Sequence, residues 1–223
     1  MTVTRILHAA GNLQATLALA EHPAIDAIEA DLWVRAGHAY AQHARPLWPL
    51  PLAVSRRGVH TDARDGVTLA NLLAAVHGRA ELVIDLRSWL GDPAPDIAAA
   101  LHRLPERSHV LITCEVWAIA DRLRAWLPGV RVAYSVRSEG QLRQFVQGQI
   151  EGSLAPTAVM VRHTLLHSAA EVAGLRRWAP SVGAWTVDNP ARAAELVAWG
   201  VDSVTSNSVG VLAGVTREVS HSP

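Results

Sequence analysis

Eight short β-rich runs alternate with longer helical stretches along the 223 residues, and this alternation limits the possible folds most strongly. The predicted strands are residues 3–7, 27–32, 82–86, 109–113, 131–135, 158–162, 182–187 and 203–205. Between them, apolar residues recur at three- and four-residue spacing in 13–21, 69–76, 97–104, 116–127, 139–147, 169–178 and 191–199. Such alternation is typical of βα units around a parallel sheet.

A closed barrel fits this pattern better than an open, doubly wound sheet. The dinucleotide-binding form of the open sheet carries a glycine-rich turn after its first strand. Residues 8–12 read His-Ala-Ala-Gly-Asn instead. We therefore predict an α/β fold in which residues 1–223 form a (β/α)8 TIM barrel as a single domain, for which the chain is long enough.

One stretch, residues 44–66, departs from the pattern. It contains Pro46, Pro49 and Pro51 as well as Gly58. It follows a short extra strand that we predict at residues 39–42. We interpret it as a long connection that acts as a lid or a packing flap.

Charge and composition exclude several classes of protein. Twenty basic and twenty acidic residues cancel, and like charges form no block, so the sequence has no nucleic-acid footprint. The single cysteine, Cys114, excludes an intramolecular disulfide. No apolar run approaches the roughly 20 residues of a membrane span, and residues 1–13 lack the pattern of a signal peptide. We expect a cytoplasmic protein with a small substrate and no stable membrane insertion; the sequence does not predict an oligomeric state.

Acidic residues lie on two neighbouring predicted strands. Glu29 and Asp31 are two residues apart in an extended segment, so their side chains point to the same face. Asp85 and Arg87 repeat this spacing on the next strand. Carboxylates aimed at one place repel unless a cation lies between them, and three oxygen ligands suit Mg²⁺ or Ca²⁺ rather than zinc. For Asp85 taken alone, a structural salt bridge is the competing interpretation.

Two histidines also lie at predicted strand ends. His8 follows the first strand, and His43 ends the extra strand. In (β/α)8 barrels the reacting groups lie at the carboxyl ends of the strands. Each histidine taken alone is as consistent with a hydrogen-bonded core residue as with a catalyst.

The order of these residues along the whole chain resembles the glycerophosphodiester phosphodiesterase family. The motifs that carry the resemblance are His8, Asn12, Glu29-Ala30-Asp31, His43, Asp85-Leu86-Arg87, Trp185-Thr186-Val187-Asp188 and Gly200-Val201-Asp202. The resemblance implies a metal-assisted attack on a phosphodiester. It assigns a divalent metal, Mg or Ca, to Glu29, Asp31 and Asp85, and makes His8 and His43 the acid–base pair. The neighbouring hydroxyl of the substrate is then a possible nucleophile, which gives a cyclic phosphate.

The chain also departs from the family pattern. Ala9 and Ala10 stand where the family has Arg-Gly, and Ala44 stands where it has Asp. The third acid and the base after it are Asp85 and Arg87, where Glu and Lys are common. The small insertion domain of many members is reduced to the loop at 44–66.

The resemblance also suggests contacts to the substrate. Arg87 would neutralise phosphate oxygens, and Trp185 would form an apolar wall for the alcohol or head group. Because the arginine after the first histidine is missing, we expect Arg137 or Arg162 to replace it, with a slight preference for Arg137. Two features, Asp85 as the third ligand and Asn207 near the end of the last strand, resemble the related sphingomyelinase D-like phospholipases.

Two other interpretations remain open. In the first, the barrel has lost its activity and binds a phosphate ligand. In the second, it is an isomerase or aldolase that uses the same acids. An aldolase needs an inward lysine for its Schiff base, and the sequence contains no lysine.

Overall fold

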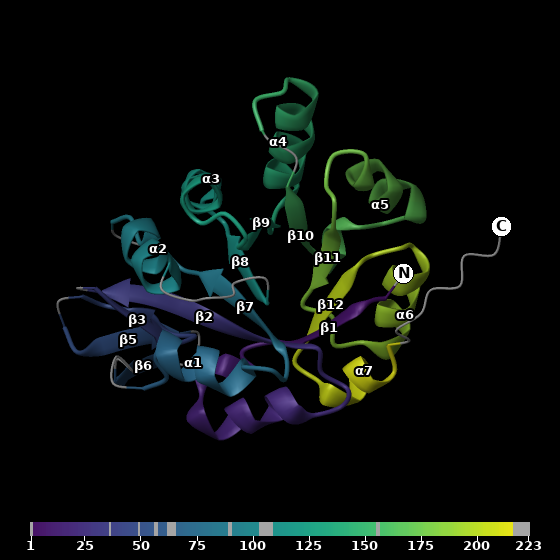
Figure 1. The fold of residues 1–223 in the computed structure, drawn as a ribbon. Coiled ribbons are helices and arrows are strands. Elements are labelled where there is room, and N and C mark those ends of the chain that lie inside the picture. Colours follow the sequence, from purple (N-terminus) through teal and green to yellow (C-terminus); the bar gives the residue numbers. More distant parts are fainter. Residues whose placement is uncertain are drawn as a thin grey trace.

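The structure is a computed structural model that describes residues 2–35, 37–48, 50–55, 58–61, 66–88, 91–102, 109–154 and 157–215. Eight parallel strands of this part form a closed barrel (Figure 1). In order around the barrel they are β1 (Thr4–Leu7), β2 (Ala27–Arg35), β7 (Glu81–Leu86), β8 (Val110–Cys114), β9 (Arg131–Val136), β10 (Ala158–Arg162), β11 (Val182–Trp185) and β12 (Ser203–Ser206). Since β1 pairs with both β2 and β12, the ring is closed. The predicted (β/α)8 barrel is confirmed.

Helices surround the barrel (Figure 1). They are α1 (Leu69–Val76), α2 (Ala94–His102), α3 (Trp117–Trp126), α4 (Glu139–Ile150), α5 (Ala169–Arg176), α6 (Pro190–Ala198) and α7 (Val209–Ala213). Several begin at a residue whose side chain accepts a backbone N–H of the first turn, a contact that satisfies an otherwise unpaired donor. These capping residues are Thr68, Ser138, Ser168, Asn189 and Ser208. The short helix α7 was not predicted, and residues 103 and 104 of the third predicted helix lie outside the described residues.

The first predicted helix, 13–21, is wrong in type. After a short turn at Ala10–Asn12, the segment Gln14–Glu21 forms a 3-10 helix. Its buried residues, Leu17 and Ala20, are three positions apart, which matches the three residues per turn of this helix. The predicted amphipathic pattern therefore identified a helical segment but not its pitch.

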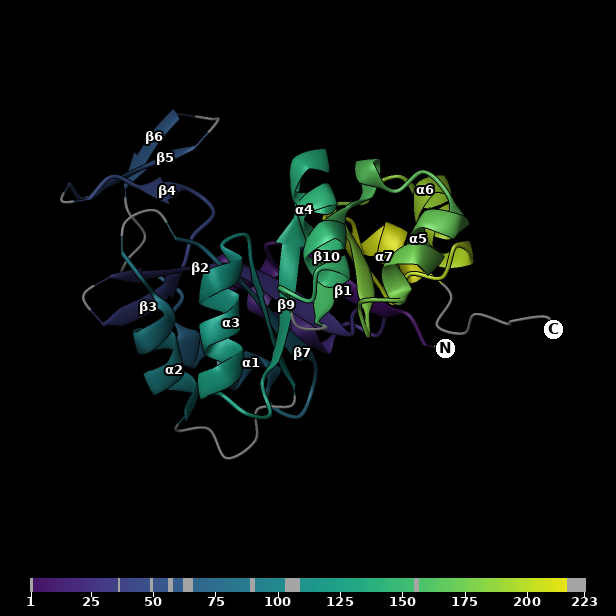
Figure 2. The same cartoon turned by 90° about the horizontal axis from the view of Figure 1, so that it is seen from above.

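The connection predicted at residues 44–66 contains strands that the sequence did not predict. Three short antiparallel strands lie there, β4 (Arg45–Pro46), β5 (Leu52–Ser55) and β6 (Gly58–Thr61). Figure 2 shows this small sheet on one side of the barrel, beyond β2 and β3. Ala53 in its middle strand is fully buried. Tertiary burial and cross-strand pairing give this segment an order that its prolines and glycines did not predict.

The extra strand is β3 (His38–Ala41), one residue earlier than predicted, and it pairs antiparallel with the outer half of β2. Gly37, in the turn between them, has a φ of 79°, a conformation that favours glycine. The hairpin extends the barrel wall beyond the ends of the other strands.

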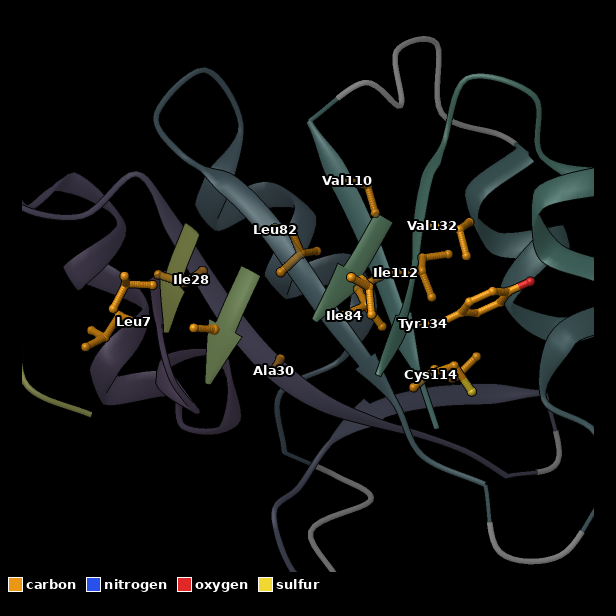
Figure 3. Close-up of a cluster of buried hydrophobic side chains, with 14 of the residues drawn as sticks. Leu7, Ile28, Ala30, Leu82, Ile84, Val110, Ile112, Cys114, Val132 and Tyr134 are labelled. Atoms are coloured by element: carbon orange, nitrogen blue, oxygen red, sulfur yellow. The ribbon is translucent and has the colours of Figure 1, made fainter. Parts of the chain in front are cut away.

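The hydrophobic core has two parts. The larger part lies between the strands and the helices and includes Ile28, Ile84, Ile112 and Tyr134 (Figure 3). The smaller part consists of residues that alternate with these along the strands and fill the barrel interior: Ile6, Ala27, Val83, Ala133 and Met160. The polar residues that continue the inward-facing set toward the carboxyl ends of the strands form the candidate site.

In the part of the chain that the structure describes, every helix is too short or too polar to cross a lipid bilayer.

Candidate metal centre and catalytic site

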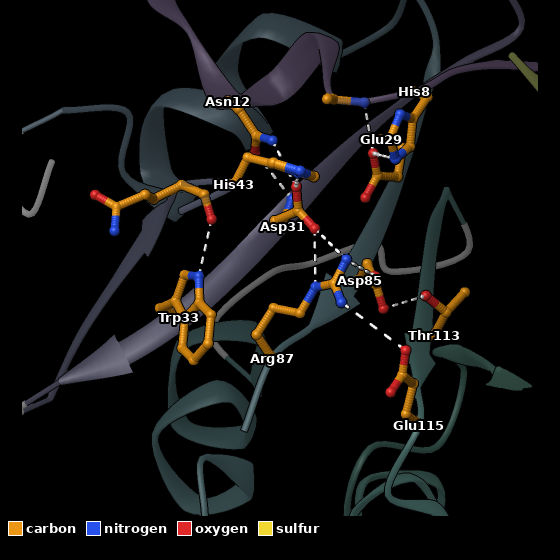
Figure 4. Close-up of polar contacts among 12 residues, drawn as sticks. His8, Asn12, Glu29, Asp31, Trp33, His43, Asp85, Arg87, Thr113 and Glu115 are labelled. Carbon is orange, nitrogen blue, oxygen red and sulfur yellow. Dashed lines mark hydrogen bonds and ion pairs between the residues drawn. The ribbon is translucent and has the colours of Figure 1, made fainter. Parts of the chain in front are cut away.

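Three carboxylates meet at the carboxyl-end mouth of the barrel (Figure 4). Glu29 and Asp31 extend from the same face of β2, and Asp85 is the direct partner of Asp31 on β7. One oxygen of each lies within 4.8 Å of the others. The i, i+2 spacing of Glu29 and Asp31 predicted their shared direction, and the strand register brings Asp85 to them.

The three carboxylates fit a hard divalent cation by their chemistry and their spacing. Carboxylate oxygens are the ligands that Mg²⁺ and Ca²⁺ prefer. Two oxygens on opposite sides of a Ca²⁺ ion lie about 4.6–5.2 Å apart, twice the usual ligand distance. Glu29, Asp31 and Asp85 could therefore share one ion after small side-chain movements.

Two of the three acids carry an electrostatic cost. Burial, together with the charges of Asp31 and Asp85, raises the pKa of Glu29 well above its ordinary value. Burial also raises the pKa of Asp85, to about 6, although Arg87 opposes this effect. Both shifts reflect negative charge held away from water.

Arg87 compensates part of this charge. Its guanidinium group donates to Asp31, with an Nε–Oδ1 distance of 2.8 Å, and lies 2.7 Å from Oδ2 of Asp85. Burial alone would raise the pKa of Asp31, but hydrogen bonding from His43 and the charge of Arg87 hold it well below its usual range. Arg87 is thus bound to two of the candidate metal ligands, and the phosphate contact that we expected of it remains a prediction.

His8 lies beside Glu29 and is held by a chain of hydrogen bonds. Its Nε2 is 3.8 Å from Oε2 of Glu29, and its Nδ1 is 2.8 Å from Oδ1 of Asn207. The other end of the Asn207 amide donates from Nδ2 to Asp188, over 2.7 Å, and Asp188 also accepts the backbone N–H of Asn207. Because a carboxylate only accepts hydrogen bonds, Asp188 fixes the orientation of the amide. In the structure Asn207 contacts His8 and Asp188, and its predicted contact to the substrate remains a prediction.

His43 lies on the other side of the acids. Its Nδ1 is 2.9 Å from Oδ2 of Asp31, and its ring is mostly exposed. Asn12 donates to the same Asp31 oxygen over 2.7 Å and accepts the Asp31 backbone N–H over 2.9 Å. The His8 and His43 rings are 6.3 Å apart and nearly perpendicular. The two histidines thus flank the acidic cluster, and their catalytic role remains a prediction.

The backbone at Ala9 also holds the site together. Its N–H donates to Oε2 of Glu29 over 2.6 Å. Ala9 has a φ of 55°, which is unusual for a residue with a Cβ atom. The segment after His8 therefore supplies a backbone donor where the family pattern has Arg-Gly.

Sequence reasoning missed two residues on β8 and just after it. Thr113 donates to Asp85 over 3.1 Å, and Glu115 accepts from Arg137 over 2.7 Å and lies 3.9 Å from Arg87. Thr113 and Glu115 show the same i, i+2 spacing at a strand end, a signal that could have identified them. Arg137, one of the two candidates for a phosphate contact, is bound to Glu115 at the rim of the mouth.

The remaining predicted residues lie on β10 and β11. Trp185 lines the small cavity of about 70 Å³ that also contains His8, Glu29 and Asp85, and its Nε1 donates to the Met160 carbonyl over 2.9 Å. Arg162 is exposed at the end of β10. Trp185 lies where a bound molecule would contact it, and the substrate contacts of Trp185 and Arg162 remain predictions.

No protein-family model matches the chain, and no curated protein sequence matches it. Solved structures do match over nearly the whole length. A glycerophosphodiester phosphodiesterase from Parabacteroides distasonis superposes with a TM-score of 0.72 at 16% identity, covering 95% of both chains. A phosphodiesterase from Oleispira antarctica, solved in complex with the product sn-glycerol-3-phosphate, gives a TM-score of 0.69 at 17% identity and covers 96% of this chain and 97% of that one.

The glycerophosphodiester phosphodiesterase from Thermotoga maritima gives a TM-score of 0.68 at 18% identity, covering 94% of this chain and 96% of that one. These TM-scores establish a common architecture, and sequence identities this low leave the activity to be argued from the site. The chain has the barrel fold of the solved glycerophosphodiester phosphodiesterases.

Proposed function

We propose that the chain is a metal-dependent phosphodiesterase that cleaves glycerophosphodiesters or related phospholipid head-group diesters. The observation that carries the proposal is the cluster of Glu29, Asp31 and Asp85 at the barrel mouth, with His8 and His43 on either side of it. The solved phosphodiesterases with this fold support the same class of reaction.

In this proposal Glu29, Asp31 and Asp85 hold a divalent cation, Mg²⁺ or Ca²⁺. Such a cation would polarise the phosphoryl oxygens and offset the negative charge that develops during the reaction. Asn12 and Ala9 keep two of the carboxylates in place through their hydrogen bonds to Asp31 and Glu29.

The hydrogen bonds around the histidines support their role in proton transfer. Because Asn207 presents its carbonyl oxygen, the Nδ1 of His8 carries the proton, and its Nε2 is free to accept one. His43 makes the equivalent Nδ1 contact to Asp31, and in this proposal its Nε2 exchanges a proton with the substrate. One imidazole takes the proton of the attacking hydroxyl as the new P–O bond forms. The other gives a proton to the alcohol oxygen as the old P–O bond breaks.

The direct test is hydrolysis of glycerophosphocholine by the purified protein with Ca²⁺ or Mg²⁺. We expect Glu29→Gln to lower metal affinity at least about tenfold and to lower turnover with it, because changes even in the groups that support metal ligands cost about 10–100-fold. The matched control is Glu139→Gln, since Glu139 is an exposed acid in the first turn of α4. Equal metal binding by both variants would exclude the proposed cation site. Phosphorus NMR of the product distinguishes hydrolysis from cyclic phosphate formation.

One observation favours a second candidate, a barrel that binds a phosphate ligand without cleaving it. Ala9 and Ala10 offer no side-chain donor to stabilise the charge that builds on a reacting phosphate beside His8, and Arg87 and Arg137 are both bound to acids. Binding of glycerol 3-phosphate together with a metal, without turnover of any diester, would support this candidate over the enzyme.

A further inference from the structure

A second and much larger cavity, of about 560 Å³, opens next to the small cavity that contains His8, Glu29 and Asp85. Its walls come from the β2–β3 hairpin, from the segment around β4 and from the start of α2, and they include Trp33, Tyr40, Pro46, Trp48 and Pro93. Arg87 lines both cavities, so they are neighbours on either side of its side chain. A molecule held at the carboxylates that extends past Arg87 would enter the larger cavity.

The strand geometry explains why an apolar wall begins where the acids end. Trp33 is two residues beyond Asp31 on β2, so both side chains point to the same face of the strand, about 7 Å apart along it (Figure 4). Tyr40 is the cross-strand partner of Trp33 on β3. Val34 and Ala39 alternate with them and pack against the main core, and Val34 also borders the cavity. The hairpin thus continues the face of β2 that carries Glu29 and Asp31 as an aromatic surface.

Most charged groups that line this cavity are already compensated. Arg87 is bound to Asp31 and Asp85, and Asp92 pairs with Arg122 over 2.8 Å. The Arg35 guanidinium lies over the Trp48 ring, 5.6 Å from its centroid.

The remaining acid, Asp96, is exposed in the first turn of α2, where the helix dipole favours a negative charge. With the face of Trp48 covered by a cation, the cavity is a poor cage for a quaternary ammonium group. It offers apolar surface of the kind that binds hydrocarbon.

We propose that this cavity binds an acyl or alkyl chain carried by one alcohol of the diester, so that the substrates are amphiphilic, single-chain phosphodiesters. The proposal rests on the phosphodiesterase function proposed above and adds its substrate class. A cavity of about 560 Å³ is in the range of roughly 300–1,000 Å³ that accommodates drug-sized molecules, well beyond the needs of glycerol. Burial of each added methylene is expected to raise affinity up to about fourfold, which corresponds to about 0.8 kcal/mol.

Binding is tested without catalysis by calorimetric titration of butyl-, hexyl-, octyl- and decylphosphocholine below their micellar concentrations, in the presence of EDTA. We expect the affinity to rise with each step until the cavity is filled. Trp33→Ala should flatten this dependence, and the control Trp126→Ala should leave it unchanged, because Trp126 is an exposed residue of α3 outside the cavity.

Trp33 also donates from Nε1 to the carbonyl of Gln42, next to His43, over 2.8 Å. Trp33→Phe separates the two roles, because it keeps an aromatic wall and removes the hydrogen bond. Chain-length dependence retained in Trp33→Phe and lost in Trp33→Ala supports the cavity. Equal loss in both variants overturns the proposal, since the hydrogen bond would then be responsible.

Activity gives an independent measurement. The ratio of kcat/KM for decanoyl lysophosphatidylcholine to that for glycerophosphocholine should exceed about 10 in the wild type and in Trp126→Ala, and should fall at least tenfold in Trp33→Ala. Turnover of glycerophosphocholine with no preference for the chain overturns the substrate class and leaves the phosphodiesterase function standing. Chain-length-dependent binding without turnover of either diester supports the cavity and contradicts the phosphodiesterase function.

Discussion

Gly183 on β11 connects the packing of the barrel interior to the candidate site. A Cβ atom built at this position would lie 2.3 Å from Sδ of Met160, 2.3 Å from Oγ of Ser203 and 2.9 Å from Cε of Met160. Favourable contacts between non-bonded carbon atoms are about 3.5–4.0 Å, so Met160 must move by roughly 1 Å. Met160 is buried and also lines the small cavity beside Glu29 and Asp85. Gly183→Ala should therefore disturb both the stability of the barrel and the shape of the site.

Overpacking of a close-packed core costs about 1–3 kcal/mol. In a protein of this size, each kcal/mol lowers the melting temperature by about 2–4 °C. We expect Gly183→Ala to lower the Tm by about 2–12 °C in differential scanning calorimetry.

The control is Gly174→Ala in α5, because a Cβ atom there meets nothing within 4 Å. This variant should be stabilised by about 0.4–1 kcal/mol, since alanine loses less conformational freedom than glycine on folding. A Tm of Gly183→Ala equal to or above that of the wild type would refute the reasoning, because the barrel interior would then have room that the structure does not show.

Three further predictions concern the site. Asn207→Ala should lower kcat at least about tenfold while leaving metal affinity within about twofold, because it removes the acceptor that fixes the proton on Nδ1 of His8. Steady-state kinetics and metal titration measure the two quantities, and an unchanged kcat would contradict the positioning role of Asn207. If Arg137 or Arg162 contacts the phosphate in the transition state, Arg→Ala at that position should lower turnover by roughly tenfold, or about 1.4 kcal/mol; full activity in both variants would show that neither does. The pKa of Asp85, raised by burial to about 6 in the folded metal-free protein, lies above its unfolded value, so its ionisation should destabilise that protein progressively as pH rises from about 4 through 6. The Tm of Asp85→Asn relative to wild type, measured in EDTA, should therefore increase over this pH range, and a constant difference would exclude the effect.

Local pattern was sufficient to predict the barrel. Most of the eight barrel strands read as short apolar runs, because in a parallel barrel the outer face of a strand packs on helices and its inner face packs in the interior. The same two-residue alternation predicted that Glu29 and Asp31 share a face, and the position of His8 at a strand end predicted its place at the mouth. These properties depend on residues close together in the sequence.

The errors in the fold arose where pairing and burial override the local sequence pattern. Pro46, Pro49 and Pro51 interrupt the apolar residues of segment 44–66 and hide a strand pattern. The strands β4, β5 and β6 nevertheless form there because they pair with one another and bury Ala53. The segment Gln14–Glu21 tightens into a 3-10 helix, with Leu17 and Ala20 on its buried side.

The sequence by itself thus determined the barrel, the direction of its inward acids and the strand-end positions of the two histidines. Only the tertiary structure decided which groups meet. The strand register places Arg87 between Asp31 and Asp85, and closure of the ring at β12 brings Asn207 to His8, 199 residues away in the chain. The large aromatic cavity exists because a hairpin, a small sheet and a helix start converge from separate parts of the chain. Contacts of this kind depend on how distant segments pack, which no local spacing encodes.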